Sequence, residues 1–217
     1  MTAPMPMRQT ALLLASGLLF AAGPRAAAET PAAAPPASPS SDPTQVRPGA
    51  YVLDPAHGKI TWSVSHLGFS TYYGQITDVS AQAVLDPKEP AKSTLTVTIG
   101  TDSVNGLNEQ LNRHLKAPDF FDTARFPKAT FTATSVEPTS PTTARVNGDL
   151  TLKGVTKPVA FDATFNQAGI NPVSKAYTVG FDGRAVIRRS DFGISAFLPL
   201  LGDDVSLRIE GEFKAAE

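Results

Sequence analysis

The sequence predicts an all-β domain whose antiparallel strands close into a barrel, with one inserted helix. Three observations support this: several runs place an apolar side chain at every second residue, turn-forming residues separate the runs, and a single run has helical spacing. Successive side chains of a strand point to opposite faces, so each run has one solvent face and one buried face. Many such strands must bury their apolar faces together, and a closed antiparallel barrel does so without leaving exposed edges.

The strands follow one another along most of the domain, and they number eight or nine. We expect them at residues 51–53, 59–66, 73–85, 93–99, 129–136, 146–152, 159–165, 177–187 and 205–213. Asp54 and Pro55 are expected to close the first strand. A bulge is expected in 73–85, because Ile76 and Val79 cannot share a face at a period of two. The turn at 153–155 predicts an antiparallel hairpin between its two flanking strands.

One helix interrupts the strands. Leu107, Leu111 and Leu115 recur every four residues, which is the spacing of one helix face. Asn105 is a candidate cap for its N-terminus, and Pro118 is expected to end it.

The N-terminus has the features of an export signal. Arg8 supplies a positive charge, residues 10–22 are apolar, and three alanines at 26–28 offer a cleavage site before Glu29. We therefore expect a signal peptide at 1–28, a disordered linker rich in Pro, Ala and Ser at 29–49, and one domain at 50–217. The expected location is the periplasm. The alternative is an N-terminal anchor that is not cleaved.

Composition excludes several classes of function. The chain has no cysteine, which rules out disulfides and thiolate chemistry. Its net charge of −1 becomes −3 when the signal peptide, with its two arginines, is removed, and a mildly acidic domain is a poor candidate for binding nucleic acid. No nucleophile elbow, zinc-protease motif or phosphate loop is present, and the three histidines lack ligand spacing, so neither catalysis nor a metal site is predicted.

A few polar residues are candidates for contact with a ligand. His66 is in phase with the apolar residues of its strand, so it is either a core histidine bonded to a carbonyl or a contact for a polar head group. Asn112, Arg113 and His114 lie on the helix between Leu111 and Leu115, and at most one or two of them can face inward. His114 flanks the apolar stripe, whereas Arg113 is expected on a solvated face. Arg189 and Asp191 share a face if their strand continues; the alternative is a surface ion pair.

Phenylalanine is abundant on the inward phase of the strands. The alternation places Phe131, Phe161, Phe165, Phe181 and Phe213 there. Phenylalanine adds buried area with no polar group to satisfy, so it suits a filled core and an apolar pocket equally well.

Six sequence blocks follow one another along the domain: residues 51–57 (YVLDPAH), 62–66 (WSVSH), 112–122 (NRHLKAPDFFD), 126–131 (FPKATF), 148–158 (GDLTLKGVTKP) and 189–193 (RSDFG). With these blocks in this order, the chain resembles the YceI-like family of exported, lipocalin-like polyisoprenoid-binding proteins. Together the blocks span nearly all of 50–217. Arg188 adds a second cation beside Arg189, which leaves open which of the two faces inward.

The resemblance implies an eight-stranded antiparallel lipocalin-like barrel around an elongated apolar cavity. That cavity would hold an isoprenoid lipid or isoprenoid quinone, with no other cofactor. The implied contacts of the head group are His66, Asn112, His114, Arg189 and Asp191. The implied apolar lining is Ile60, Trp62, Val64, Phe69, Leu95, Val97, Leu111, Phe120, Phe131, Phe161, Phe165 and Phe181.

Two other classes of function stay open from the sequence. A barrel enzyme would use His66 with Asp191 as paired titrating groups. An interaction module for a membrane cytochrome or stress machinery would have a filled barrel and an exposed apolar patch. Transient contact with the inner membrane and a homodimer are further expectations.

Overall fold

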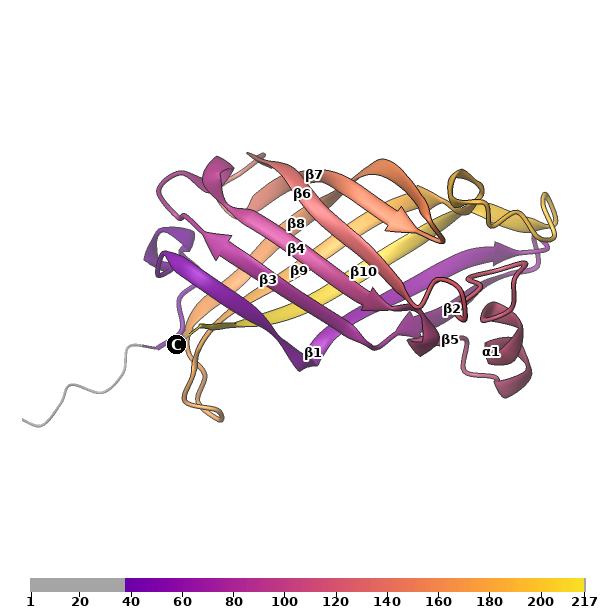
Figure 1. Cartoon of the computed structure of the whole chain (residues 1–217). Coiled ribbons are helices and arrows are strands. Elements are labelled where there is room, and N and C mark those ends of the chain that lie inside the picture. Colours follow the sequence, from indigo (N-terminus) through magenta and orange to yellow (C-terminus); the bar gives the residue numbers. More distant parts are fainter. Residues whose placement is uncertain (1–37, 217) are drawn as a thin grey trace, which may run out of the picture. The chain divides into compact units, whose positions relative to one another are not determined.

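A computed structural model describes residues 38–216, and strands dominate them (Figure 1). The strands are β1 Gly49–His66, β2 Ser70–Ile76, β3 Val79–Leu85, β4 Thr94–Gly100, β5 Val104–Asn105, β6 Lys128–Pro138, β7 Thr143–Leu152, β8 Val155–Ile170, β9 Tyr177–Arg188 and β10 Leu201–Ala215. The helices are α1 Glu109–Leu115 and four 3₁₀ turns, η1 Pro43–Gln45, η2 Pro90–Lys92, η3 Thr101–Ser103 and η4 Arg189–Phe192. None of the described helices is long and apolar enough to cross a membrane.

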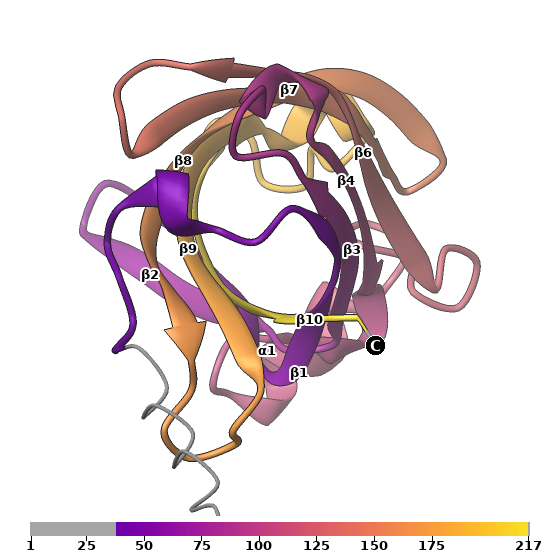
Figure 2. The ribbon, with the colours of Figure 1, turned by 90° about the vertical axis from the view of Figure 1, so that its left-hand side faces the viewer.

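Eight of these strands close into a ring, which confirms the predicted barrel. Their order is β10-β9-β8-β7-β6-β4-β3-β1, and β10 also pairs with β1. All of the pairings are antiparallel, including the predicted β7–β8 hairpin. Figure 2 shows the ring of strands along the barrel axis. Closure leaves no free edge between the first and last strands of the ring.

The first two predicted strands are one long strand. β1 runs from Gly49 to His66, with a register shift between Leu53 and Gly58 where Asp54 and Pro55 lie. The prediction that these two residues end a strand is wrong, because β10 pairs with β1 on both sides of the irregularity. Proline is tolerated at such a bulge, where a ladder hydrogen bond is already missing.

The predicted strand 73–85 is two strands rather than one strand with a bulge. β2 pairs with the second half of β1, whereas β3 pairs with its first half. Between them, the hydroxyl of Ser103 accepts hydrogen bonds from the backbone N–H groups of Thr77 (3.2 Å) and Asp78 (2.9 Å). The phase change between Ile76 and Val79 therefore marks a break in the chain path. β2 and β5 extend beside the barrel at the end where α1 lies (Figure 1).

The helix is shorter than its leucine spacing indicates. Asn108, not Asn105, caps it by accepting the N–H of Leu111 at 3.0 Å. Leu107 lies outside the helix at a φ of 59°, with 76% of its surface exposed. Asn105 instead accepts the N–H of Leu107 and an N–H of the Asn112 amide. The apolar spacing alone could not separate a helix from the turn that precedes it.

The described part of the predicted linker is ordered, so the domain begins before residue 50. Ser40 exchanges backbone hydrogen bonds with Ala168, and η1 follows. Val46 is buried among the core residues at this end of the barrel. We call residues 40–47 the strap. The predicted signal peptide and linker residues 29–37 lie outside the described residues.

Two tyrosines hold the strap. The Tyr177 hydroxyl accepts the N–H of Arg47 at 3.2 Å and donates to the carbonyl of Gln45 at 3.1 Å. The Arg47 guanidinium lies 4.2 Å from the centre of the Tyr177 ring. The Tyr51 hydroxyl donates to the carbonyl of Arg47 at 2.7 Å, and burial raises the pKa of Tyr51 to about 12.

We expect Tyr177→Phe to loosen the strap without unfolding the barrel. The substitution removes both hydroxyl contacts and keeps the aromatic ring under Arg47. Hydrogen exchange followed by mass spectrometry should show faster exchange within residues 40–47. Tyr73→Phe, at an exposed tyrosine on β2, is the matched control and should leave that exchange unchanged. Equal exchange in both variants would show that the strap is held by other contacts.

Candidate ligand-binding site

The barrel interior contains two adjoining apolar chambers. The aromatic chamber, lined by Phe131, Phe161, Phe165, Phe181 and Phe213 among others, has a volume of about 310 Å³. The helix-end chamber has a volume of about 420 Å³ and is lined by Trp62, Leu111, Leu115, Phe120 and Phe197 among others. Four aliphatic residues line both chambers, and we call them the waist: Ile60, Ile99, Leu150 and Leu207.

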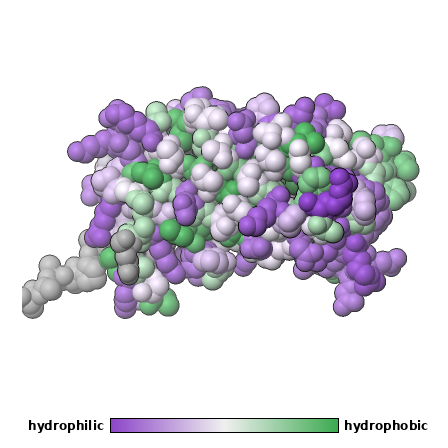
Figure 3. Space-filling view, in the orientation of Figure 1, coloured by the Kyte–Doolittle hydropathy of each residue, from purple (hydrophilic) through white to green (hydrophobic). Residues whose placement is uncertain are grey.

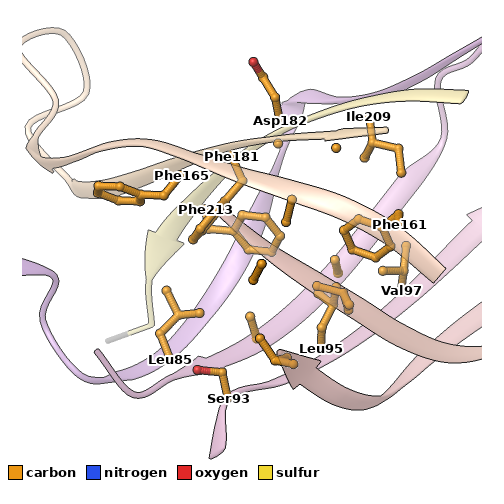
Figure 4. Close-up of a pocket in the computed structure, with 18 of the residues that line it drawn as sticks. Leu85, Ser93, Leu95, Val97, Phe161, Phe165, Phe181, Asp182, Ile209 and Phe213 are labelled. Carbon is orange, nitrogen blue, oxygen red and sulfur yellow. The ribbon is translucent and has the colours of Figure 1, made fainter. Parts of the chain in front are cut away.

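Aromatic rings form much of the wall of the aromatic chamber. Phe165 and Phe213 each make an edge-to-face contact with Phe181, at ring-centre distances of 5.8 and 6.1 Å. Phe131 and Phe161 make another at 5.6 Å. Such pairs stabilise one another while leaving only carbon atoms toward the interior. Figure 4 shows Phe161, Phe165, Phe181 and Phe213, from three strands, turned toward a common space.

Small residues make room for that space. Ala81 and Ala83 are buried on the inward phase of β3 and line the aromatic chamber with Val79. Gly183 of β9 lies where an added β-carbon would come within 3.4 Å of Phe161 and Ile209. Larger side chains at these positions would fill the interior, so their small size keeps it open.

The helix-end chamber combines apolar walls with a few polar side chains. Trp62 and Val64 come from β1, Tyr72 from β2, and Leu111 and Leu115 from α1. The indole of Trp62 packs directly over Gly74, where a β-carbon would overlap it. The polar lining residues are His66, Thr101, His114 and Arg189. Among residues 38–216 no carboxylate lines this chamber.

The two predicted histidines lie at the outer part of this chamber. His66 is the last residue of β1 and is exposed, with its ring 6.1 Å from that of Tyr72. His114 packs edge-on against Phe120 and Phe197, and its Nε2 lies 2.7 Å from a carboxylate oxygen of Asp119. His66 is therefore a residue of the chamber mouth and not a core histidine.

Arg189, and not Arg188, faces inward. Its guanidinium is buried and donates to the carbonyls of Gly202 (2.8 Å), Leu201 (2.9 Å) and Ile194 (3.0 Å). Burial lowers its pKa, an effect that nearby Asp203 partly offsets. A guanidinium has five N–H donors, so two remain for other acceptors. Arg188 is exposed and pairs with Asp203 at 3.1 Å.

Two predicted head-group residues do not line the chamber. The Asn112 amide accepts the N–H of Gly106 at 2.7 Å and so fixes the turn before α1. Asp191 is exposed. The condition for a face shared with Arg189, a strand that continues past this point, is not met, because β9 ends at Arg188 and η4 begins. Residues two apart in a 3₁₀ turn point in different directions.

All but one of the predicted apolar lining residues line at least one of the chambers. Phe69 is the exception: it lies in the turn between β1 and β2 and is 90% exposed. β1, whose inward side chains line the chamber, ends at His66, so Phe69 lies beyond its inward phase. Sequence reasoning also missed the segment after η4, from which Ile194, Phe197 and Leu200 line the helix-end chamber. Its irregular path has no period, so the only available signal was its apolar composition.

The histidine outside the chambers belongs to a surface cluster at the irregularity of β1. His57 Nδ1 and Lys214 Nζ lie 2.9 and 2.8 Å from the same oxygen of Asp54. These contacts, with Lys214 first and His57 second, lower the pKa of Asp54 to about 2. Within the described residues no group of three or more His, Asp and Glu side chains is placed to hold a metal ion.

Because of this cluster, the free energy of unfolding should depend on pH in the acid range. The pKa of Asp54 is lower in the folded chain, so its stabilising contribution is complete above about pH 4 and is lost as the pH falls through about 2. We expect Asp54→Asn to flatten the decline of Tm between those values. Thermal unfolding followed by circular dichroism from pH 5 to pH 2 measures this. Asp162→Asn removes a carboxylate that pairs with exposed Arg145 and should keep the parental profile. A decline equally steep in Asp54→Asn would contradict the assignment.

The closed barrel and its two apolar chambers define a class of protein, the lipocalin-like barrels that enclose an internal cavity. The YceI-like domain family model matches residues 51–213, so the chain belongs to the YceI-like family. A UPF0312 protein of Shewanella oneidensis is 37% identical over 167 residues, which cover 76% of this chain and 87% of that protein. A UPF0312 protein of Pseudomonas savastanoi is 38% identical over 146 residues, covering 66% of this chain and 76% of that protein.

Solved structures show the same fold. The crystal structure of Burkholderia cenocepacia BcnA has a TM-score of 0.67 at 26% identity and covers 74% of this chain and 98% of BcnA. The Campylobacter jejuni YCEI protein has a TM-score of 0.63 at 32% identity, covering 70% and 90%. A polyisoprenoid-binding domain from Saccharophagus degradans has a TM-score of 0.55 at 14% identity, covering 78% and 100%, a likeness of fold alone.

Proposed function

We propose that this protein is an exported carrier that holds an isoprenoid lipid, such as an isoprenoid quinone or a polyprenyl lipid, in its barrel. The observation that carries the proposal is the pair of apolar chambers joined at an aliphatic waist inside a closed barrel. Carbon-lined walls in both chambers suit a flexible hydrocarbon chain. The polyisoprenoid-binding domain of Saccharophagus degradans has the same fold.

The polar end of the ligand should lie in the helix-end chamber. His66, His114 and Arg189 line this chamber, and each can donate a hydrogen bond to an oxygen acceptor. The charged residues that border the aromatic chamber are Lys59 and three acids, Asp86, Asp182 and Glu210. In Figure 4 the carboxylate of Asp182 points away from the phenylalanines. An anionic or carbonyl head group is therefore better placed beside the histidines and the arginine.

Burial of the chain supplies the affinity. Each CH₂ group removed from water contributes about 0.8 kcal/mol, so a few isoprene units suffice for tight binding. The polar contacts then need only set the orientation of the lipid. Other ligands or cofactors are not required by this proposal.

The alternatives fit the site less well. An enzyme that pairs His66 with Asp191 needs both groups at one substrate, and Asp191 does not line either chamber. An interaction module for a membrane cytochrome or stress machinery predicts a filled barrel, which the chambers disfavour. Export to the periplasm is part of the proposal and is tested by N-terminal sequencing of protein released from the periplasm, which should begin at Glu29.

The single tryptophan provides a direct test of binding. Trp62 is the only tryptophan of the chain and it lines the helix-end chamber. Titration with ubiquinone should quench its fluorescence saturably, because the quinone ring would lie beside the indole. Undecaprenyl phosphate, which lacks a quinone, should compete and restore the emission if it occupies the same cavity.

Analysis of the native ligand completes the test. The protein purified without detergent is denatured, and the organic extract is examined by mass spectrometry. An isoprenoid lipid in the extract, at about one molecule per chain, is the expected result. An extract without lipid, together with no saturable quenching by ubiquinone and no uptake of undecaprenyl phosphate, would overturn the proposal.

A further inference from the structure

We propose that the mouth of the helix-end chamber docks onto the surface of a phospholipid bilayer. The proposal rests on the proposed function, since it concerns how the carried lipid enters and leaves. The surface consists of residues 65–73 and 193–201, and we call it the rim. Its exposed apolar side chains are Leu67, Phe69, Tyr73, Phe197 and Leu200.

The two segments of the rim are neighbours in space. The N–H of Leu67 donates to the carbonyl of Leu200 at 3.0 Å, and His66 is paired with Leu201 where β1 meets β10. In Figure 3 apolar residues gather at the end of the barrel where Figure 1 places the segment before β10. The two segments of the rim therefore lie side by side at one end of the molecule.

Neither segment of the rim contains a residue with a formal charge. Neither SHLGFSTYY (65–73) nor GISAFLPLL (193–201) contains Asp, Glu, Lys or Arg, although 18% of the chain is charged. Exposed turns of a water-facing surface ordinarily carry such residues. A charged side chain placed in the boundary between head groups and acyl chains is costly, whereas phenylalanine, tyrosine and leucine favour that depth.

The backbone holds two of these side chains in an unfavourable conformation. Leu67 and Phe197 have φ values of 56° and 60°, in the left-handed region that residues with a β-carbon seldom adopt. Glycine would adopt it without strain, and Gly68 follows directly after Leu67. Strain of this kind is found at functional surfaces, where the side chain itself is needed.

The rim is continuous with the cavity, and this identifies its partner. Leu67, Phe197 and Leu200 are exposed and also line the helix-end chamber. A lipid that leaves a bilayer under the rim would pass from acyl chains to chamber wall without crossing water. A second copy of the chain seated on the rim would cover the mouth and block this path, so the bilayer is the better partner.

An isolated apolar residue elsewhere offers a control. Val173, in the turn between β8 and β9, is 89% exposed, close to the value for Phe69. Lys175 lies two residues away, and the turn lines neither chamber. A valine in such a turn should not bind a bilayer.

Flotation with vesicles of phosphatidylcholine and phosphatidylglycerol tests the proposal on the mature protein. The parental protein should float with the vesicles. Phe69→Ser should reduce the bound fraction severalfold, and Phe69→Ser with Leu200→Ser by about tenfold or more, since each removes an inserted side chain. Val173→Ser should bind as the parent does. Thermal unfolding of each variant checks that the barrel is intact.

The readouts separate this proposal from the proposed function. Because Phe69 does not line the cavity, ubiquinone should quench the Trp62 fluorescence of Phe69→Ser as it does in the parent. Saturable quenching without any flotation would overturn the docking proposal and leave the carrier standing. If the protein floats, the rim variants do not, and no lipid is bound in the cavity, the carrier proposal is overturned and the docking proposal stands. The docking proposal would also be overturned if the parental protein were a dimer that does not float and the double variant were a monomer. That result would assign the rim to contact with a second copy of the chain.

Discussion

Ile99→Trp should shorten the cavity and remove lipids whose chains cross the waist. Ile99 lines both chambers, so an indole at this position would occupy the passage between them. Its cross-strand neighbours, Val79 on β3 and Ala129 on β6, are small and leave room for the larger ring. We expect the amount of long-chain lipid in the purified protein to fall about tenfold or more. Overpacking should cost about 1–3 kcal/mol of the free energy of unfolding.

Thr98→Trp is the matched control for this variant. It adds the same side chain one residue earlier on β4, and successive side chains of a strand point to opposite faces. The indole should then lie outside the barrel and the lipid content should stay at the parental value. Mass spectrometry of the extracts gives both amount and chain length, and urea unfolding gives the stability. Unchanged long-chain lipid in a folded Ile99→Trp would show that the bound chain does not cross the waist.

Arg189→Ala should destabilise the helix-end of the barrel strongly. The buried guanidinium donates to three backbone carbonyls that lie on both sides of the segment 195–200. Its removal leaves these carbonyls unsatisfied, and we expect the free energy of unfolding to fall by about 3 kcal/mol. Urea unfolding measures the loss. Hydrogen exchange should accelerate in residues 194–202, which include much of the rim.

Two further variants test whether the loss of stability comes from the carbonyl contacts of Arg189. Arg189→Lys keeps the charge but cannot reach three carbonyls at once, so it should recover only part of the stability. Arg188→Ala removes the exposed neighbour that pairs with Asp203 and should change stability little. If the alanine variants at 188 and 189 were equally stable, the carbonyl contacts of Arg189 would not hold the segment.

The regular part of the barrel was predictable from the sequence because its physical signal is local. In β6, for example, Ala129 and Phe131 are buried and Thr130 and Thr132 are exposed, as the alternation requires. The β7–β8 hairpin followed from the turn at Lys153 and Gly154, both of which have positive φ. Most of the cavity wall follows from the same rule, since inward residues of a barrel face a common interior.

The predictions from the sequence are wrong where tertiary contacts decide the structure. Asp54 and Pro55 look like a strand end, but β10 supplies a partner on both sides of them. Residues 40–47 have a linker composition, yet contacts with Tyr51 and Tyr177 order them. Leu107 fits the helical spacing but precedes the cap at Asn108. In each case the deciding partner is distant in sequence or the boundary is a hydrogen bond that no period reveals.

The sequence by itself determined the all-β class, the inward phase of most strands and the family, because alternation and ordered motifs are properties of the chain alone. Only the tertiary structure decided that the interior is hollow, because a phenylalanine on an inward phase serves a packed core or a cavity wall equally well. Closure of β1 on β10 brings those side chains around one interior, and the small residues Ala81, Ala83 and Gly183 leave part of it unfilled. Closure also places Leu67 beside Leu200, from segments at opposite ends of the domain sequence, and so creates the mouth.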